Sequence, residues 1–482
     1  MLSCTPADEP NACPSCRCCS PGLQLASAQI TQALSRRGML AGAGAVSAAF
    51  AVGRPGSGLA APASTPPVVL TNFQLFDGKG AALRGGVRLL IQDGRLKLGG
   101  GETSAPGGAK TIDCGGRVLM PGLIDAHWHT MFAAMSVETL LQASIEDILA
   151  SAKGEAEQTL MRGFTTIRDL GGPSFVLKHA IDAGAAKGPR IYPSGPMITT
   201  SGGHGDLRPL SDIPRSPGGP VSQAEKTGGI AIADSADEIR LRVREQFMQG
   251  ASQIKLVGGG GVSSPRTTLD MLTFSEAELR AAIEATKDRN TYATVHAYPS
   301  PVIRRAMAAG AQCIEHGHLM DEATARLMAD NGIWLSTQPF VSEEDSLPLT
   351  GQSHTNLLQV IGGTNRLYEL AKAHRIKTAF GTDILFSAEM TRRQGLMLTH
   401  LTRWYEPADI LRMATSVNGE LMALSGPRNP YPGKLGTIED GAWADLLVVN
   451  GSPLQDISLL ARPEQSLALI MKDGVIYKNT LS

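Results

Sequence analysis

The sequence is short of cysteine and has no excess of either charge. Of its 7 cysteines, only Cys114 and Cys313 lie beyond residue 19, so no disulfide framework is available to support the fold. The 44 basic and 45 acidic residues nearly cancel, which excludes the strongly basic surface typical of nucleic-acid binding. The stability of this 482-residue chain must come from its own hydrophobic core, and a chain of this length normally forms more than one structural unit.

The first 63 residues have the pattern of an export signal. Arg36-Arg37 precede a weakly apolar run at 41–52, which is too short to cross a bilayer, and small residues at 61–63 offer a cleavage site. Paired arginines before such a run resemble a twin-arginine signal, so we expect a periplasmic or secreted protein with no membrane span. The cysteine cluster at 13–19 has no histidine partner nearby; a zinc knuckle or an extension without a role in the mature chain are its two interpretations.

Short strand patterns occur at both ends of the remaining chain. They occupy residues 68–76, 86–95, 444–450 and 469–477 and are separated by glycine-rich turns. Strand sets that lie far apart in sequence can pair in one sheet. We therefore expect residues 64–119 and 426–482 to join as one small β-sandwich.

Strand and helix patterns alternate over residues 120–425. Helical stretches such as Ser235 to Met248 and Ser275 to Arg289 each open with a serine that can cap the helix. This alternation predicts an α/β fold in which the strands form a TIM-like (β/α)8 barrel. The segment from Pro209 to Gly229 is rich in Gly, Pro and Ser, and we expect it to be a mobile loop at the mouth of the barrel.

Six residues of metal-binding type follow one another along the barrel region, and most end or directly follow a short apolar run. They are His127, His129, Lys255, His296, His316 and Asp383. His127 and His129 stand at i and i+2 of a strand pattern, so both rings can reach one ion. A single histidine at a strand end is usually structural, and Gly-Thr-Asp by itself is simply a turn. The joint order of all six indicates metal-assisted hydrolysis.

Lys255 stands inside the apolar run from Gln253 to Val257. A charged ammonium there is costly unless it is paired or neutralised. A neutral lysine amine can instead add carbon dioxide and become a carbamate, whose two oxygens can each bind a different ion. An edge or snorkelling lysine is the alternative interpretation. The ligand order favours a carboxylated Lys255 that bridges two metal ions.

From about Val68 to its C-terminus, the chain resembles the amidohydrolase superfamily. The similarity lies in segments 121–129, 254–256, 295–298, 314–316 and 381–383. Within the superfamily the chain is most similar to the Xaa-Pro dipeptidase-like and carboxypeptidase-like branch that includes ochratoxinase, through segments 165–169, 200–206 and 260–264. The four glycines from Gly258 to Gly261 and the segment 265–268 depart from this pattern, so their loop need not match relatives with known substrates.

The resemblance implies a binuclear metal-dependent amidohydrolase with zinc as the expected metal. It places His127, His129, carboxylated Lys255 and Asp383 on one ion, and Lys255, His296 and His316 on the other. A hydroxide that bridges the ions would attack the substrate, and Asp383 would pass its proton to the leaving amine. His204 and the second ion would stabilise the oxyanion. A histidine in a flexible glycine-rich turn is the other interpretation of His204.

The resemblance also implies a substrate class. In this branch a residue at the place of Tyr298 contacts the free carboxylate of the released amino acid, and Val262 and Ser263 line the side-chain pocket. Tyr298 follows His296 by two residues and therefore faces the same side of the strand; a tyrosine packed at the barrel rim is the alternative. We expect cleavage of the C-terminal amide of N-acyl amino acids or dipeptides, with ochratoxin A as a test compound.

Other functions are compatible with the same barrel. A deaminase or cyclic-amide hydrolase would use it too, but the common deaminase pattern lacks the bridging Lys255. A non-catalytic descendant would be expected to have lost ligands, and none is lost here. Lactonase and phosphotriesterase-like chemistry is open to the same two-metal set. Relatives are commonly oligomeric, often octameric, so the resemblance also implies a homo-oligomer.

Overall fold

The computed structural model describes residues 66–99, 106–214, 216 and 219–481, and Thr65–Ser482 form one compact unit. The predicted export signal and the cysteine cluster at 13–19 lie outside the described residues, so export stays a prediction, as does assembly into an oligomer. In the described part of the chain, no helix is both long and apolar enough to cross a membrane.

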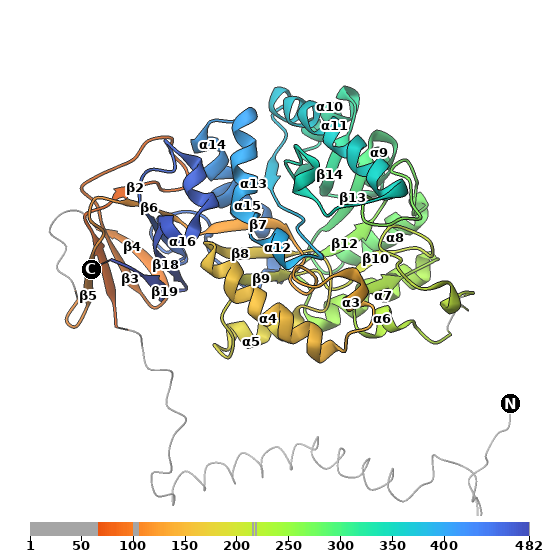
Figure 1. The fold of residues 1–482 in the computed structure, drawn as a ribbon, viewed down its shortest axis with the longest axis horizontal. Helices are drawn as coiled ribbons and strands as arrows, with labels where there is room; N and C mark the ends of the chain where they lie inside the picture. The colour runs from red at the N-terminus through yellow and green to blue at the C-terminus, as the bar shows by residue number, and fades with distance from the viewer. Residues whose placement is uncertain (1–65, 100–105, 215, 217–218, 482) are drawn as a thin grey trace, which may run out of the picture. The chain divides into compact units, whose positions relative to one another are not determined.

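Two parallel sheets form the centre of the fold (Figure 1). The smaller sheet has the order β7-β8-β9 and consists of β7 (Leu123–Trp128), β8 (Phe164–Asp169) and β9 (Arg190–Pro193). The larger sheet has the order β11-β10-β12-β13-β14-β15-β16 and consists of β10 (Met197–Thr199), β11 (Ile230–Ile232), β12 (Ile254–Val257), β13 (Ala293–Pro299), β14 (Cys313–Leu319), β15 (Trp334–Thr337) and β16 (Thr378–Phe380).

The predicted closed barrel is not formed as one continuous ladder in the described chain. Strand pairing is interrupted between β9 and β12 and between β16 and β7. Pro193 ends β9 and Pro196 precedes β10, and proline has no N–H to donate to a ladder. Single backbone hydrogen bonds cross both gaps, from Ser252 N to Pro193 O and from Asp383 N to His127 O, each at 2.8 Å. The α/β prediction is confirmed, in the form of two parallel sheets.

Helices connect the parallel strands. The two stretches expected from the sequence are α7 (Ala236–Gln249) and α8 (Glu276–Lys287), and Ser235 and Ser275 cap them through their side chains. The other α-helices described are α3 (Val137–Leu140), α4 (Ile145–Met161), α5 (Phe175–Asp182), α6 (Gln223–Lys226), α9 (Ser300–Ala309), α10 (Glu322–Asp330), α11 (Gly351–Ala373), α12 (Ala388–Thr391), α13 (Gln394–His400), α14 (Pro407–Arg412), α15 (Asn418–Ala423) and α16 (Pro463–Ser466). The predicted loop 209–229 thus contains a helix, α6, whose Ser222 and Glu225 form a capping box.

Strands from the two ends of the described chain form two further sheets, and one of these sheets combines strands from both ends (Figure 1). The predicted small β-sandwich domain stays a prediction. The orders of the two sheets are β4-β3-β1-β5 and β19-β18-β17-β6-β2, and the bounds of their strands are β1 (Val68–Thr71), β2 (Gln74–Leu75), β3 (Arg88–Gln92), β4 (Arg95–Gly99), β5 (Lys110–Asp113), β6 (Val118–Pro121), β17 (Leu446–Val449), β18 (Leu467–Lys472) and β19 (Val475–Asn479). Leu70 and Leu89 of one sheet share a hydrophobic cluster with Leu446 and Leu469 of the other. Gly122 alone separates β6 from β7, so these sheets adjoin the strand that carries His127.

Three of the expected end strands are each divided in two. The run 68–76 breaks at Asn72, 86–95 at Asp93-Gly94, and 469–477 at Asp473-Gly474. All of these residues have positive φ, between 51° and 75°, a conformation that Asn, Asp and Gly adopt at lower cost than other residues. The last two breaks turn the chain back on itself, because β3 pairs with β4 and β18 with β19 in antiparallel fashion.

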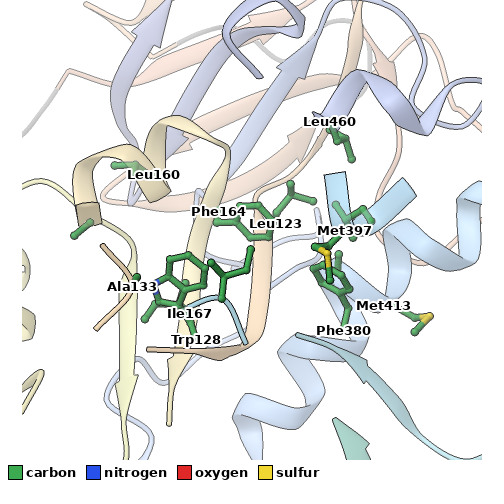
Figure 2. Packing of buried hydrophobic residues seen from close by; sticks show 14 of the residues in the cluster. Leu123, Trp128, Ala133, Leu160, Phe164, Ile167, Phe380, Met397, Met413 and Leu460 are labelled. Carbon is green, nitrogen blue, oxygen red and sulfur yellow. The ribbon is translucent and has the colours of Figure 1, made fainter. Parts of the chain in front are cut away.

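A hydrophobic cluster packs the junction of β7, β8 and β16 with the neighbouring helices (Figure 2). Leu123 of β7, Phe164 of β8 and Phe380 of β16 are fully buried. Leu160 of α4 and Met397 of α13 belong to the same cluster. Burial of these apolar side chains holds β16 against β7 although no ladder joins the two strands, and this brings the end of β16 next to the histidines of β7.

Candidate metal centre and active site

All six predicted metal ligands line one cavity, here called the first cavity. His127, His129, Lys255, His296, His316 and Asp383 contribute to its wall, and so does His204. His127 lies in β7 and His129 directly after it, and the others come from β12, β13, β14 and the segment after β16, so strands that are far apart in sequence bring them together. His296 and His316 lie inside β13 and β14, which continue beyond them; the sequence had placed both at strand ends.

Asp383 is the centre of the ligand cluster. Its Oδ1 lies 3.2 Å from His127 Nε2 and 3.0 Å from His129 Nε2, and its Oδ2 lies 4.0 Å from His316 Nδ1. One ligand atom each from His127, His316 and Asp383 can be chosen within 4.8 Å of one another. This group combines members of both expected ion sites, so the two sites are contiguous.

The backbone is strained at two of these ligands. His316 has φ 75° and Asp383 has φ 53°, although neither is glycine. Such conformations cost about 1–3 kcal/mol and persist only where the surrounding structure enforces them. The hydrogen bond from Asp383 N to His127 O provides part of that constraint. Glycine at position 381 permits the close approach of this segment to His127, because a Cβ there would lie 2.5 Å from His127 Cβ.

The charges in the site are arranged around one carboxylate. Burial alone would raise the pKa of Asp383, but His127 and the other facing imidazoles hold it well below its usual value. Burial lowers the pKa of His129, and burial together with neighbouring imidazoles lowers that of His296. These two rings are therefore neutral at pH 7 and have lone pairs available for a metal ion.

Lys255 is 2% exposed, and burial lowers the pKa of its amine. Among the described residues, the structure gives its Nζ no hydrogen bond and no salt bridge. A buried ammonium without a direct partner is unfavourable, whereas a neutral amine is tolerated. The surroundings of Lys255 therefore match the condition for carbamate formation.

The sequence analysis did not recognise Glu315 as a partner of the ligand cluster. Its Oε2 accepts a hydrogen bond from His127 Nδ1 at 2.8 Å, and its Oε1 accepts from Arg168 Nη2 at 2.5 Å and from Thr294. Burial would raise the pKa of Glu315, but Arg168 and His127 hold it well below its usual value. The carboxylate fixes the proton of His127 on Nδ1, so that Nε2 presents its lone pair to the site.

Gln338 is a second residue that the sequence analysis missed. Its Oε1 lies 2.8 Å from His316 Nδ1, and its Nε2 lies 3.2 Å from His127 Nδ1. The signal was present, because Gln338 directly follows β15 just as the predicted ligands end or follow their strands. Gln338 Oε1 can accept a hydrogen bond from His316 Nδ1 and so orient that ring, whereas the protonated His127 Nδ1 that donates to Glu315 cannot also accept from Gln338 Nε2.

His204 lies against His296, with the ring centroids 4.6 Å apart. Burial lowers its pKa to about 4, so the ring is neutral at pH 7. Its Nδ1 lies 2.8 Å from Ser264 Oγ, and that oxygen already accepts from Gly205 N at 2.8 Å. The serine hydroxyl can then donate to Nδ1, which leaves Nε2–H free to donate into the site. Gly261 is required here, because a Cβ would lie 2.3 Å from the His204 ring.

The predicted substrate contacts lie in an adjoining second cavity. Tyr298, Val262, Ser263 and His204 contribute to its wall. The Tyr298 ring stacks on His316, with centroids 4.8 Å apart. Burial, with a contribution from Asp383, raises the pKa of Tyr298 well above its usual value, so the phenol stays protonated and can donate a hydrogen bond.

Comparison with known proteins agrees with this geometry. Residues 118–478 match the Amidohydrolase family. The chain belongs to this family. Ochratoxinase of Aspergillus niger is 28% identical over 429 residues, which cover 84% of this chain and 85% of that enzyme. Crystal structures of an amidohydrolase and of a prolidase complexed with N-methylphosphonate-L-proline are 33% and 30% identical, with TM-scores of 0.79 and 0.78, and each match covers 86% of this chain and 100% of the other.

The resemblance stated from the sequence is thereby confirmed at the level of the superfamily and of the branch that contains prolidases and ochratoxinase. The amidohydrolase is a hydrolase that acts on amide or peptide bonds. Its family generally binds divalent metals, and the cluster fits such ions, because imidazole nitrogens and a carboxylate are among their usual ligands.

Proposed function

We propose that this amidohydrolase uses two divalent ions, with zinc the expected metal, to hydrolyse the C-terminal amide of N-acyl amino acids or dipeptides. The observation that carries the proposal is the convergence of all six predicted ligands on one cavity. The proposal treats the two parallel sheets as one (β/α)8 barrel, whose active site lies at the carboxyl ends of its strands. Ochratoxin A, an aroyl-phenylalanine, is a suitable test compound.

Divalent ions bound here would act as Lewis acids and lower the pKa of water to about 7. His127, His129, His296, His316, Asp383 and a carboxylated Lys255 would hold them. Asp383 would take up a proton at Oδ1 or Oδ2 and return it to the leaving amine. Its carboxylate lies among the ligand imidazoles, with Oδ1 next to His127 Nε2 and His129 Nε2. His204 Nε2–H would donate to the carbonyl oxygen of the scissile bond as negative charge develops on it.

The experiment that tests this function combines metal analysis with a substrate screen. The purified enzyme should contain divalent metal, and chelation followed by re-addition should remove and restore activity. N-acyl amino acids, lactones and phosphotriesters are then compared at equal concentration. Turnover of N-acyl amino acids supports the proposal; turnover of only lactones or phosphotriesters would assign the site to that chemistry instead.

Tyr298 is proposed to bind the free carboxylate of the released amino acid. Among the described residues that line the second cavity there is no Lys or Arg, so the phenol is one of few donors there. Hydrogen bonds to a charged group are worth about 1.5–3 kcal/mol, which corresponds to about tenfold or more in rate.

We expect an N-acyl-phenylalanine to have a kcat/KM at least about tenfold above that of its carboxamide, and Tyr298→Phe to narrow this difference. The measurement is kcat/KM for both compounds with both enzymes. Tyr368→Phe is the matched control, since Tyr368 is also fully buried but lies outside both cavities. Equal kcat/KM values for the two compounds in the wild type would contradict the proposal that Tyr298 binds the substrate carboxylate.

Glu315 is expected to support metal binding through His127. Glu315→Gln keeps the size of the side chain but removes the charge that fixes the His127 tautomer, so metal affinity should fall about 10–100-fold. Metal content after dialysis against a chelator gives the measurement. Glu343→Gln is the matched control, because Glu343 contacts His354 at the same 2.8 Å but on the surface. Equal metal retention in wild type and Glu315→Gln would contradict the role.

A further inference from the structure

The first and second cavities meet at the ligand cluster. His204, Ser263, His296, Asp383, Leu385 and Phe386 line both of them. A substrate whose scissile bond lies beside Asp383 must therefore extend one half into each cavity. Of the substrate contacts predicted from the sequence, Tyr298 and Val262 line only the second cavity and His204 and Ser263 line both, so none belongs to the first cavity alone.

The part of the first cavity away from the ligands is lined by apolar side chains. Phe132 lies after β7, Ile148 lies in α4, and Leu140 and Leu141 come from the end of α3. Leu141 is 43% exposed, so a large apolar side chain stands against water at the rim of the cavity. Apolar surface of this kind is stabilised when an apolar group covers it.

The position of Tyr298, the proposed carboxylate anchor, decides which half of the substrate enters which cavity. Apart from Lys255 in the ligand cluster, no Lys or Arg is among the described residues that line either cavity, and Tyr298 lines only the second. The carboxylate of the released amino acid therefore finds its donor in the second cavity, at Tyr298. The acyl group, on the other side of the scissile carbonyl, is left to the first cavity.

We propose that the first cavity is the acyl-binding site, that it selects bulky apolar or aromatic acyl groups, and that Leu140 and Leu141 determine this selectivity. The proposal rests on the proposed function. Water adds to the acyl carbon, the C–N bond breaks, and the amine leaves with a proton through the second cavity, so the acid product remains in the first. Selectivity follows because one apolar contact in such a pocket discriminates about tenfold or more between acyl groups.

The test compares the kcat/KM values of two substrates that differ only in the acyl group. We expect the wild type to prefer N-naphthoyl-phenylalanine over N-acetyl-phenylalanine, and Leu141→Asn to lower the ratio of their kcat/KM values about tenfold. Leu327→Asn is the matched control, because Leu327 is a leucine of similar exposure, 40%, on α10 outside both cavities. A ratio that Leu141→Asn leaves at the wild-type value overturns the proposal.

A reciprocal variant tests the orientation. Leu347 lines only the second cavity, so Leu347→Asn should alter the preference between N-acetyl-phenylalanine and N-acetyl-alanine and leave the naphthoyl-to-acetyl ratio as it was. If Leu347→Asn and not Leu141→Asn lowers that ratio, the acyl group binds in the second cavity and the assignment is wrong.

Binding of naphthamide separates this inference from the proposed function. The compound has the apolar ring but no carboxylate, and its binding is followed by fluorescence without turnover. If the wild type hydrolyses neither amino-acid derivative, the proposed function fails. Naphthamide binding then still tests whether the first cavity is an apolar binding site. Weaker binding to Leu141→Asn than to Leu327→Asn supports the apolar site; equal binding to both, or none to the wild type, overturns it.

Discussion

Lys255→Ala is expected to abolish hydrolysis and to reduce the metal content of the purified enzyme. The buried amine of Lys255 has a lowered pKa and lies in the wall of the cavity that holds the other five ligands, where a carbamate would bridge two ions. Loss of that bridge removes several kcal/mol of transition-state stabilisation, so activity should fall by at least about 100-fold. Metal content by elemental analysis and kcat/KM on one N-acyl amino acid give the two readouts.

A chemical rescue makes this test specific. A short carboxylic acid such as propionate fills the space that the side chain vacates and should restore part of the activity of Lys255→Ala. Lys472→Ala is the matched control, because Lys472 is also buried, at 5% exposure, and burial lowers its pKa, but it lies on β18 in an end sheet. Wild-type turnover by Lys255→Ala without any added acid would rule out the bridge.

Asp383→Asn is expected to keep the fold and much of the metal but to lower kcat by roughly 10²-fold or more, as the loss of a general acid–base requires. Asn keeps the shape of Asp and tolerates its positive φ of 53°, so the backbone should not move. The amide cannot take up and return a proton. The measurement is kcat across a pH series together with metal content.

A surface position provides the control for this variant. Asp93 has a similar φ of 51° in the turn between β3 and β4, so Asp93→Asn makes the same chemical change in a similar conformation away from both cavities. Its kcat should equal that of the wild type. If the kcat of Asp383→Asn were unchanged over the whole pH range, Asp383 could not be the general acid–base.

The strand patterns predicted residues that the fold brings to one cavity, because the relevant rule is local. His127 and His129 alternate along a strand, and alternate residues share one side, so both line the first cavity. Lys255 is buried in β12, as its apolar neighbours indicate. The same local rule predicted α7 and α8, whose serine caps can be read from adjacent residues. The prediction of continuous strands failed at Asn72, Asp93 and Asp473, because it overlooked the preference of Asn and of Asp-Gly for turns with positive φ.

The sequence by itself indicated which residues could hold a metal ion and that strands and helices alternate between them, because side-chain periodicity and chemistry are properties of short segments. Only the tertiary structure decided that Glu315 accepts from His127, 188 residues away, that the parallel strands pair in two sheets, and that the site opens into two cavities. These features depend on contacts between strands that are distant in the chain, and burial of the shared core fixes which of them meet.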